Sequence, residues 1–243
     1  MPSVLILGAT SDIGFAIADK YASQKYSIQL AGRNTAQLKT LQSDLTIRHQ
    51  VPCTVHAFDA MDLASHEAFY AGLPVKPDIT ICVVGYMNDN EIVIRDQSET
   101  LKTIGTNFTG PVSILNIIAA DYAARKQGVI AGISSVAGNR GRQSNYIYGS
   151  AKAGFTAYLS GLRNKLYHDQ VHVLTVLPGF VRTKMTDHLK LPGLLTAEPG
   201  QVANAVYNGI RKKKNIIYVK WFWRWIMLII TSVPEFMFKK KKL

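Results

Sequence analysis

Short apolar runs alternate with amphipathic segments of helical length along most of this chain. Seven runs have the length of β-strands and cover residues 4–7, 27–31, 51–58, 79–84, 129–133, 171–177 and 216–219. Between them, residues 13–23, 38–48 and 158–167 carry apolar side chains at three- and four-residue spacing, which is typical of a helix with one buried face. Strand alternating with helix favours a parallel sheet that is covered by helices on both faces.

The domain organisation follows from length and composition. The chain has 243 residues, 47% of them hydrophobic and 18% charged, which suits one large buried core. It contains no repeat and no linker rich in Pro, Gly or Ser. We therefore expect one α/β domain over residues 1–219 and a separate tail over residues 220–243. Residues 179–201 are dense in loop signals and predict a flexible lid.

The cysteines and the first residues bear on the compartment. Cys53 and Cys82 both lie in apolar, strand-like runs, so we expect buried free thiols in a reducing cytosol. The chain starts without a basic segment or a cleavage signal for secretion. These features predict a cytoplasmic protein.

A glycine-rich turn, residues 8–14, joins the first apolar run to a helical segment. Its glycines, Gly8 and Gly14, would let the backbone approach a pyrophosphate, and the helix N-terminus would supply N–H groups. Asp12 stands in the middle, where glycine is frequent. Because an acid beside a pyrophosphate is unhelpful, we favour the interpretation that Ser11 or Asp12 caps the helix.

The ends of the second and third runs bear on the choice of dinucleotide. Arg33 stands where an NAD site usually places an acid, and it can pair with a 2′-phosphate, which favours NADP(H) over NAD(H). Alternatively, Arg33 is a solvated turn residue, while Asn34 and Gln37 cap the next helix. Asp59 is expected either to accept from the adenine amino group or to cap a helix.

Tyr148 and Lys152 stand four residues apart at the start of a helical segment, so they share one face. An ammonium group nearby is expected to lower the tyrosine pKa from about 10, which makes the pair an acid–base device. Such a pair can protonate a carbonyl oxygen while a nicotinamide gives hydride to the carbon. A surface pair without function is the alternative.

Three further features support that chemistry. Ser135 ends a strand and could donate a hydrogen bond to the substrate oxygen. Asn107 stands inside a predicted helix although Asn has a low helix propensity, which suggests a specific role. Alternatively, Asn107 is a polar residue inside the helix without a specific function. The turn from Pro178 onwards could place Val181 and Thr183 against the carboxamide and phosphates of the cofactor.

Together these pieces resemble the short-chain dehydrogenase/reductase family over residues 1 to about 219. The resemblance implies a doubly wound, seven-stranded, Rossmann-type parallel sheet and a homodimer or homotetramer. It implies that Tyr148 is the catalytic acid/base, Lys152 holds the nicotinamide ribose, Ser135 orients the carbonyl and Asn107 holds a water. No metal site is expected. The cofactor would contact Gly8, Thr10, Ser11, Asp12, Ile13, Gly14, Arg33, Asn34, Asp59, Gly85, Tyr148, Lys152, Pro178, Gly179, Val181 and Thr183.

Asp12, residues 180–190 and the basic tail are also similar to the decaprenylphosphoryl-2-ketoribose reductases. Those enzymes reduce the 2-keto group of a polyprenyl-phosphate-linked pentose and complete an epimerisation that a flavin-dependent oxidase begins. The resemblance implies an NADPH-dependent ketoreductase with such a lipid-linked substrate and partner. A reductase of another lipid-like ketone (3-ketoacyl, sphingoid or steroid) and a non-catalytic nucleotide sensor remain alternatives.

The net charge of +12 is concentrated near the C-terminus, since ten Lys or Arg residues and one acid follow Ile210, in the tail and directly before it. Residues 221–238 are too short to span a bilayer, which takes about 20 apolar residues. On a helix, Lys220, Arg224, Thr231 and Glu235 form one polar stripe beside three tryptophans. We expect this tail to bind the cytoplasmic face of a membrane, with subunit packing as the alternative.

The tail is expected to contain two helices, and nucleic acid is not expected to bind. Residues 232–235 predict a capping box that ends one helix and starts a short second one. Nucleic acid is not an expected partner, because the body is nearly neutral and offers no base-stacking platform.

Overall fold

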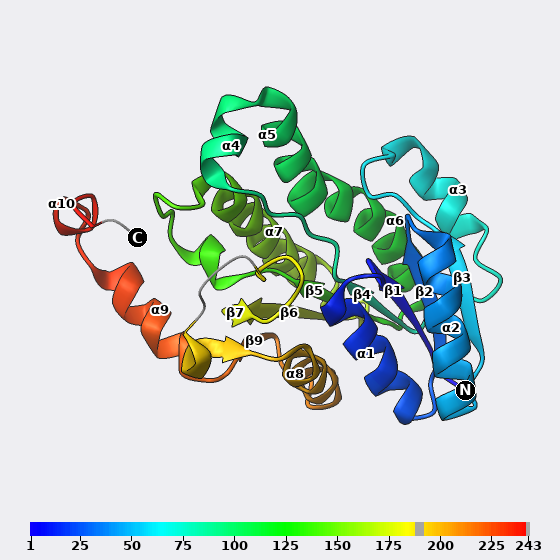
Figure 1. Ribbon diagram of the computed structural model, residues 1–243. Coiled ribbons are helices and arrows are strands. Elements are labelled where there is room, and N and C mark those ends of the chain that lie inside the picture. Colours follow the sequence, from blue (N-terminus) through cyan, green and yellow to red (C-terminus); the bar gives the residue numbers. More distant parts are fainter. Residues whose placement is uncertain (188–191, 242–243) are drawn as a thin grey trace.

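The computed structural model describes residues 1–187 and 192–241. Its centre is a parallel sheet of seven strands in the order β3-β2-β1-β4-β5-β6-β9 (Figure 1). All seven predicted strands are confirmed within a few residues at each end. Their bounds are β1 (Ser3–Leu7), β2 (Ser27–Gly32), β3 (Cys53–Ala57), β4 (Ile79–Cys82), β5 (Val129–Ile133), β6 (His172–Pro178) and β9 (Ile216–Val219).

The strands are apolar throughout because both faces of the sheet are covered. In β1, Val4 and Ile6 contribute to one core, whereas Leu5 and Leu7 contribute to the core on the opposite face. All four side chains are fully buried. This explains why the strands appear in the sequence as continuous apolar runs.

Helices cover both faces, as expected for a doubly wound fold (Figure 1). One core includes side chains of α1 (Asp12–Ser23), α2 (Thr35–His49) and α8 (Pro199–Arg211). The other includes side chains of α3 (His66–Ala71), α6 (Gly110–Arg125) and α7 (Tyr146–Lys165). Two short helices, α4 (Asn90–Arg95) and α5 (Gln97–Ile104), contact α7.

The chain direction across the sheet determines where a ligand can bind. From β1 the chain proceeds outward through β2 and β3, and then returns to β4 on the other side of β1. Loops after β1 and β4 therefore diverge at the carboxyl edge of the sheet and leave a crevice there. Both cysteines are buried and free, as predicted.

The segment predicted as a lid contains short regular elements. β7 (Phe180–Val181) pairs in parallel with β8 (Thr196–Ala197), and a short 3₁₀ turn, Gly193–Leu195, precedes β8. Residues 188–191 of this segment lie outside the described residues. Whether the segment opens and closes stays a prediction.

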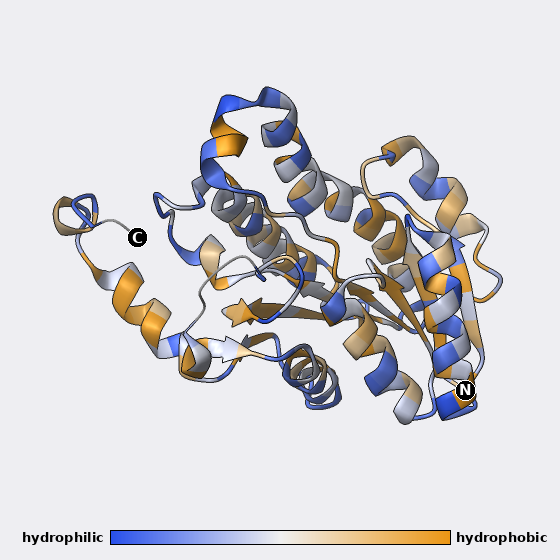
Figure 2. Cartoon of the chain, in the orientation of Figure 1, coloured by the Kyte–Doolittle hydropathy of each residue, from blue (hydrophilic) through white to orange (hydrophobic). Residues whose placement is uncertain are grey.

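The tail forms two helices, α9 (Trp223–Ser232) and α10 (Glu235–Phe238). Trp223 and Met227 are buried against Val136 and Leu177 of the body, so one side of α9 is docked. Figure 2 shows that α9 is mostly hydrophobic although it lies at the edge of the molecule. No helix in the described ranges is long and apolar enough to cross a membrane.

The predicted capping box at residues 232–235 is wrong. The Ser232 hydroxyl donates back to Leu228 O within α9, and Pro234 is the residue that precedes α10. The Glu235 carboxylate accepts instead from Arg140 of the body. The sequence pattern failed here because a distant arginine engages the Glu235 carboxylate that a local capping box would have used.

Candidate active site

The glycine-rich turn packs too tightly for side chains at its two glycines. Gly8 has a φ of +90°, and a Cβ on Gly14 would lie 2.5 Å from Gly8 O. The Ser11 hydroxyl donates to Gly8 O and accepts from Gly14 N at 3.0 Å. Ser11 therefore caps α1, which confirms one of the two predicted caps.

Asp12 has a different role from the cap that the sequence suggested. Its Oδ2 accepts from the backbone N–H of Lys184 at 2.7 Å, across 172 residues of chain. The acid thereby ties the loop after β7 to the glycine-rich turn. This contact gives a structural reason for an aspartate at a position where glycine is frequent.

The residues predicted for the adenosine end lie at the carboxyl ends of β2 and β3. Arg33 is exposed and follows Gly32, where a Cβ would lie 3.7 Å from the Thr10 side chain. Asn34 Oδ1 accepts from Gln37 N at 3.0 Å, which confirms Asn34 as the cap of α2, but no bond from Asn34 N to the Gln37 side chain completes a capping box in the described structure. Asp59 Oδ1 accepts from Met61 N at 2.9 Å and closes a turn rather than capping a helix.

A cavity of 390 Å³ at the carboxyl edge of the sheet brings most of the predicted site together. The predicted residues that line it are Thr10, Ser11, Asp12, Ile13, Gly85, Ser135, Tyr148, Lys152, Pro178, Gly179, Val181 and Thr183. Those that do not line it are Gly8, Gly14, Arg33, Asn34, Asp59 and Asn107.

Lys152 is 3% exposed, and its Nζ donates to Ile133 O at 3.1 Å. Burial lowers the pKa of this lysine to about 8, so at neutral pH the ammonium still predominates. Nζ lies 5.8 Å from the centre of the Tyr148 ring. The buried cation thus has room beside it for polar groups of a ligand.

Burial raises the pKa of Tyr148 to about 12, and the Ser135 hydroxyl works against this rise. The expectation that Lys152 lowers this pKa is wrong for the present arrangement, because desolvation of the phenol dominates. A phenol with this pKa keeps its proton at neutral pH. Tyr148 is therefore ready to donate that proton to a ligand oxygen.

The two adjacent serines at the end of β5 have different roles. Ser134 Oγ donates to Lys152 O at 2.9 Å and also contacts Thr156 Oγ1. Ser135 Oγ accepts from Ala137 N at 3.1 Å, which leaves its own proton for a ligand. The geometry supports the choice of Ser135 as the serine that faces a substrate.

Asn107 is fully buried behind the cavity in a π-helical turn, Gly105–Thr109. Its Nδ2 donates to Tyr86 O and to Thr103 O, and its Oδ1 accepts from Tyr86 N. A Cβ on Gly85 would lie 3.4 Å from Asn107 Oδ1 and 3.6 Å from Lys152 Nζ. Gly85 thus lies where these two polar groups converge.

Several cavity residues were missed by sequence reasoning. Arg142 and Asn145 come from the loop before α7, and Trp223 comes from the tail. The first two stand between Ser135 and Tyr148, a position that could have marked them as neighbours of the site. Trp223 offered no such signal, because its place depends on how α9 docks.

Apolar side chains make up much of the remaining wall of the cavity: Val83, Val84, Met87, Ile133, Val136, Phe180, Met185 and Trp223. The Trp223 ring packs edge-on against Phe180, with ring centres 5.5 Å apart. A Cβ on Gly179 would lie 2.0 Å from the Trp223 indole, so a glycine is needed there. The tail thus contacts the same turn that was predicted to hold the cofactor.

Comparisons with known proteins agree with this geometry. The family model described as short chain dehydrogenase matches residues 2–192. The chain is 30% identical over 240 residues to an uncharacterised oxidoreductase of Mycobacterium tuberculosis, covering 98% of this chain and 96% of that protein. It is 32% identical over 244 residues to an uncharacterised oxidoreductase of Streptomyces coelicolor, covering 98% and 95%.

A solved structure provides an independent check of the fold. A short-chain dehydrogenase from Sphingobium yanoikuyae, solved in complex with NADPH, superposes with a TM-score of 0.83 over 97% of each chain at 23% identity. This likeness covers the sheet, both helical layers and nearly the whole length of the chain. The chain belongs to the short-chain dehydrogenase family of oxidoreductases.

Proposed function

We propose that this protein is an NADPH-dependent ketoreductase. The observation that carries the proposal is the cavity that is lined by the protonated Tyr148, the hydroxyl of Ser135 and the buried Lys152. Each group is a hydrogen-bond donor, and a ketone oxygen is an acceptor that can use two of them. A non-catalytic nucleotide sensor would have no need of the tyrosine and the serine together.

The residues present fit a dinucleotide. The first-turn N–H groups of Asp12 and Ile13 have no intrahelical acceptor, and the glycines below them bring the backbone close to a pyrophosphate. Exposed Arg33 at the end of β2 suits a 2′-phosphate, which favours NADP(H) over NAD(H). The structural relative solved with NADPH supports the same choice. When bound, this cofactor supplies a hydride to the carbonyl carbon.

The protein's own groups would then handle the proton. Tyr148 donates its phenolic proton to the carbonyl oxygen, and the Ser135 hydroxyl holds that oxygen in place. Lys152 binds the ribose hydroxyls and stabilises the phenolate that Tyr148 leaves behind. Asn107 keeps the π-helical turn in place and holds a water through which Tyr148 regains a proton.

The apolar wall of the cavity supports a hydrophobic substrate. We favour the 2-keto group of a polyprenyl-phosphate-linked pentose, with a flavin-dependent oxidase supplying the ketone. Another lipid-like ketone of the 3-ketoacyl, sphingoid or steroid type is the second candidate, because the same wall suits it. The direct test incubates the purified protein and NADPH with polyprenylphosphoryl ribose and a flavin oxidase.

Formation of the arabinose epimer, dependent on both enzymes, is the expected result of that incubation. A parallel reaction with 3-ketoacyl and steroid ketones separates the two candidates. Rapid reduction of those ketones without any epimer would reject the sugar substrate. No NADPH oxidation with any of them would reject the ketoreductase itself.

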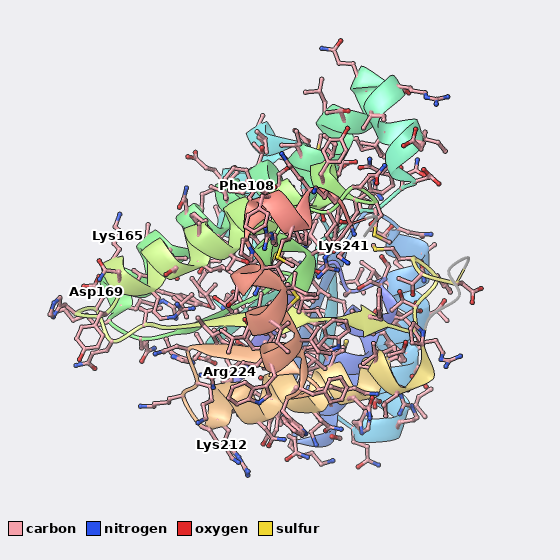
Figure 3. All side chains as sticks on the ribbon, turned by 90° about the vertical axis from the view of Figure 1, so that its left-hand side faces the viewer. Phe108, Lys165, Asp169, Lys212, Arg224 and Lys241 are labelled. Carbon is pink, nitrogen blue, oxygen red and sulfur yellow. The ribbon has the colours of Figure 1, made fainter. Side chains whose placement is uncertain are left out.

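The tail is proposed to hold the enzyme on the cytoplasmic face of a membrane. Trp225, Leu228 and Ile229 of α9 are more than half exposed although α9 is docked on its other side. The labelled Arg224 and Lys241 lie on the side of the molecule that Figure 3 presents, where α9 and α10 are in front. Exposed apolar side chains together with basic residues suit the surface of a membrane that contains anionic lipid. Residues 1–219 would form the catalytic domain of a homodimer or homotetramer.

A further inference from the structure

The cavity contains an arginine whose guanidinium finds little hydrogen bonding in the described part of the fold. Arg142 belongs to the loop before α7, six residues ahead of Tyr148, and lines the same cavity as Tyr148 and Ser135. Its Nε is buried and has no hydrogen-bond partner within residues 1–187 and 192–241. Its Nη2 contacts only the thioether of Met227, at 3.2 Å, which is a weak acceptor.

Other partly buried arginines of this protein are satisfied. Arg140, two residues earlier, donates to Ile230 O at 2.7 Å and forms an ion pair with Glu235. Arg163 donates to Val173 O, Thr175 Oγ1 and Asn215 O. A guanidinium that loses water without gaining an acceptor is costly, so Arg142 is the exception that needs an explanation.

The other polar groups of the cavity point to a ligand of negative charge. Among the described lining residues the charged side chains are Asp12, Arg142, Lys152 and Lys184. Lys152 is already assigned to the cofactor ribose, which leaves the Arg142 guanidinium for a further acidic group. Asp12 is already used by the Lys184 backbone. Asn145, which also lines the cavity, has a buried Oδ1 without a partner and could accept from a ligand hydroxyl.

We infer that Arg142 binds an acidic group of the substrate, so that this enzyme acts on an anionic ketone whose carboxylate or phosphate reaches the loop before α7. The inference rests on the proposed ketoreductase function and names the substrate class. A guanidinium presents paired N–H donors that match both acids. Because Met227 of α9 contacts Arg142, the tail also helps to position this group.

Three ketones of similar size test the inference: 2-oxooctyl phosphate, 4-oxononanoate and the methyl ester of 4-oxononanoate. Wild-type enzyme is expected to prefer at least one anion over the ester in kcat/KM, and the ratio between the two anions tells phosphate from carboxylate. Arg142→Met is expected to lower the anion-to-ester ratio by about 10- to 150-fold, the value of one charge-assisted hydrogen-bonded contact. Arg142→Lys should retain part of the preference.

The matched control is Arg95→Met, which removes an exposed arginine of α4 that does not line the cavity and should leave the ratio unchanged. Thermal unfolding checks that Arg142→Met folds, and its melting temperature should equal or exceed that of the wild type, since an unpaired buried charge is lost. An anion-to-ester ratio that is the same in wild type and both Arg142 variants overturns the inference.

A binding measurement separates this inference from the ketoreductase proposal. Calorimetric titration of the NADP⁺ complex with the two anionic ketones needs no turnover. Binding that depends on Arg142 without any reduction would retain the anion site and reject the ketoreductase. Reduction of the ester at the same efficiency as the anions would retain the ketoreductase and reject the anion site.

Discussion

The carboxyl edge of the sheet has buried polar groups that lack hydrogen-bond partners, whereas the C-terminal tail has large apolar side chains that are exposed to solvent. At the sheet edge, polar groups are buried without full partners, as in Arg142 and Asn145. On the tail, the carboxylate of Glu235 is paired with Arg140, whereas large apolar side chains such as Trp225 and Ile229 are exposed. The first region suits a polar ligand that enters it, and the second suits the apolar surface that we propose covers it.

The two regions are connected through one helix. Trp223 fills the space next to Gly179 and lines the cavity, and Met227 contacts Arg142. Two residues along, Trp225 is 55% exposed. Some residues of α9 therefore contact the body and the cavity, whereas others are exposed. Single substitutions in α9 can then test the cavity and the exposed side of the tail separately.

The largest effect is expected from Tyr148→Phe at the sheet edge. Loss of the proton donor should lower kcat for ketone reduction by about 10²- to 10⁴-fold, while NADPH affinity changes little because the ring remains. Tyr146→Phe, which removes the hydroxyl of an exposed tyrosine two residues earlier in α7, is the control. Normal turnover in Tyr148→Phe would mean that another group supplies the proton.

The next largest effect concerns the docked side of the tail. Trp223→Ala should lower the free energy of unfolding by about 3–5 kcal/mol, because a buried indole is removed from a closed contact. Trp225→Ala should change it by about 0.5 kcal/mol or less. Denaturant titration of both variants checks the difference. Equal losses would show that α9 does not dock as described.

A pH effect should distinguish Lys152 from the exposed lysines of the tail. Its pKa is lowered to about 8, so the ammonium is present at pH 7 and is lost as the pH rises through 8. Because NADPH would favour the charged form, its affinity should fall by up to about tenfold per pH unit above pH 8. Lys152→Met should bind NADPH weakly with no such inflection. The measurement is the Kd for NADPH between about pH 7 and 9.5.

The smallest effect concerns the exposed side of the tail. Replacing Trp225 and Ile229 with serine should lower binding to vesicles that contain anionic lipid by about tenfold, through lost burial of apolar area. The activity of this variant toward a water-soluble ketone should be that of the wild type. Sedimentation with vesicles measures the bound fraction. Unchanged binding would favour subunit packing as the role of this side.

Sequence reasoning succeeded where the signal was local. Continuous apolar runs identified the seven strands, and the glycine-rich turn identified the edge of the sheet at which the candidate site lies. It failed where distant segments meet, as for the bond between Asp12 and Lys184 or the docking of Trp223 against Gly179. The pKa of Tyr148 was also mispredicted, because desolvation depends on the whole fold and not on the spacing to Lys152.

The central claim, hydride transfer to a ketone in the cavity around Tyr148, can be tested with NADPH carrying two deuterium atoms at C4 of the nicotinamide. The protein is incubated with this cofactor and 4-oxononanoate, and the alcohol is analysed by mass spectrometry. The account predicts one deuterium on the new carbinol carbon in the wild type and almost no alcohol in Tyr148→Phe. Tight binding of NADPH without any labelled alcohol, from this ketone or from the lipid-like ketones, would contradict it.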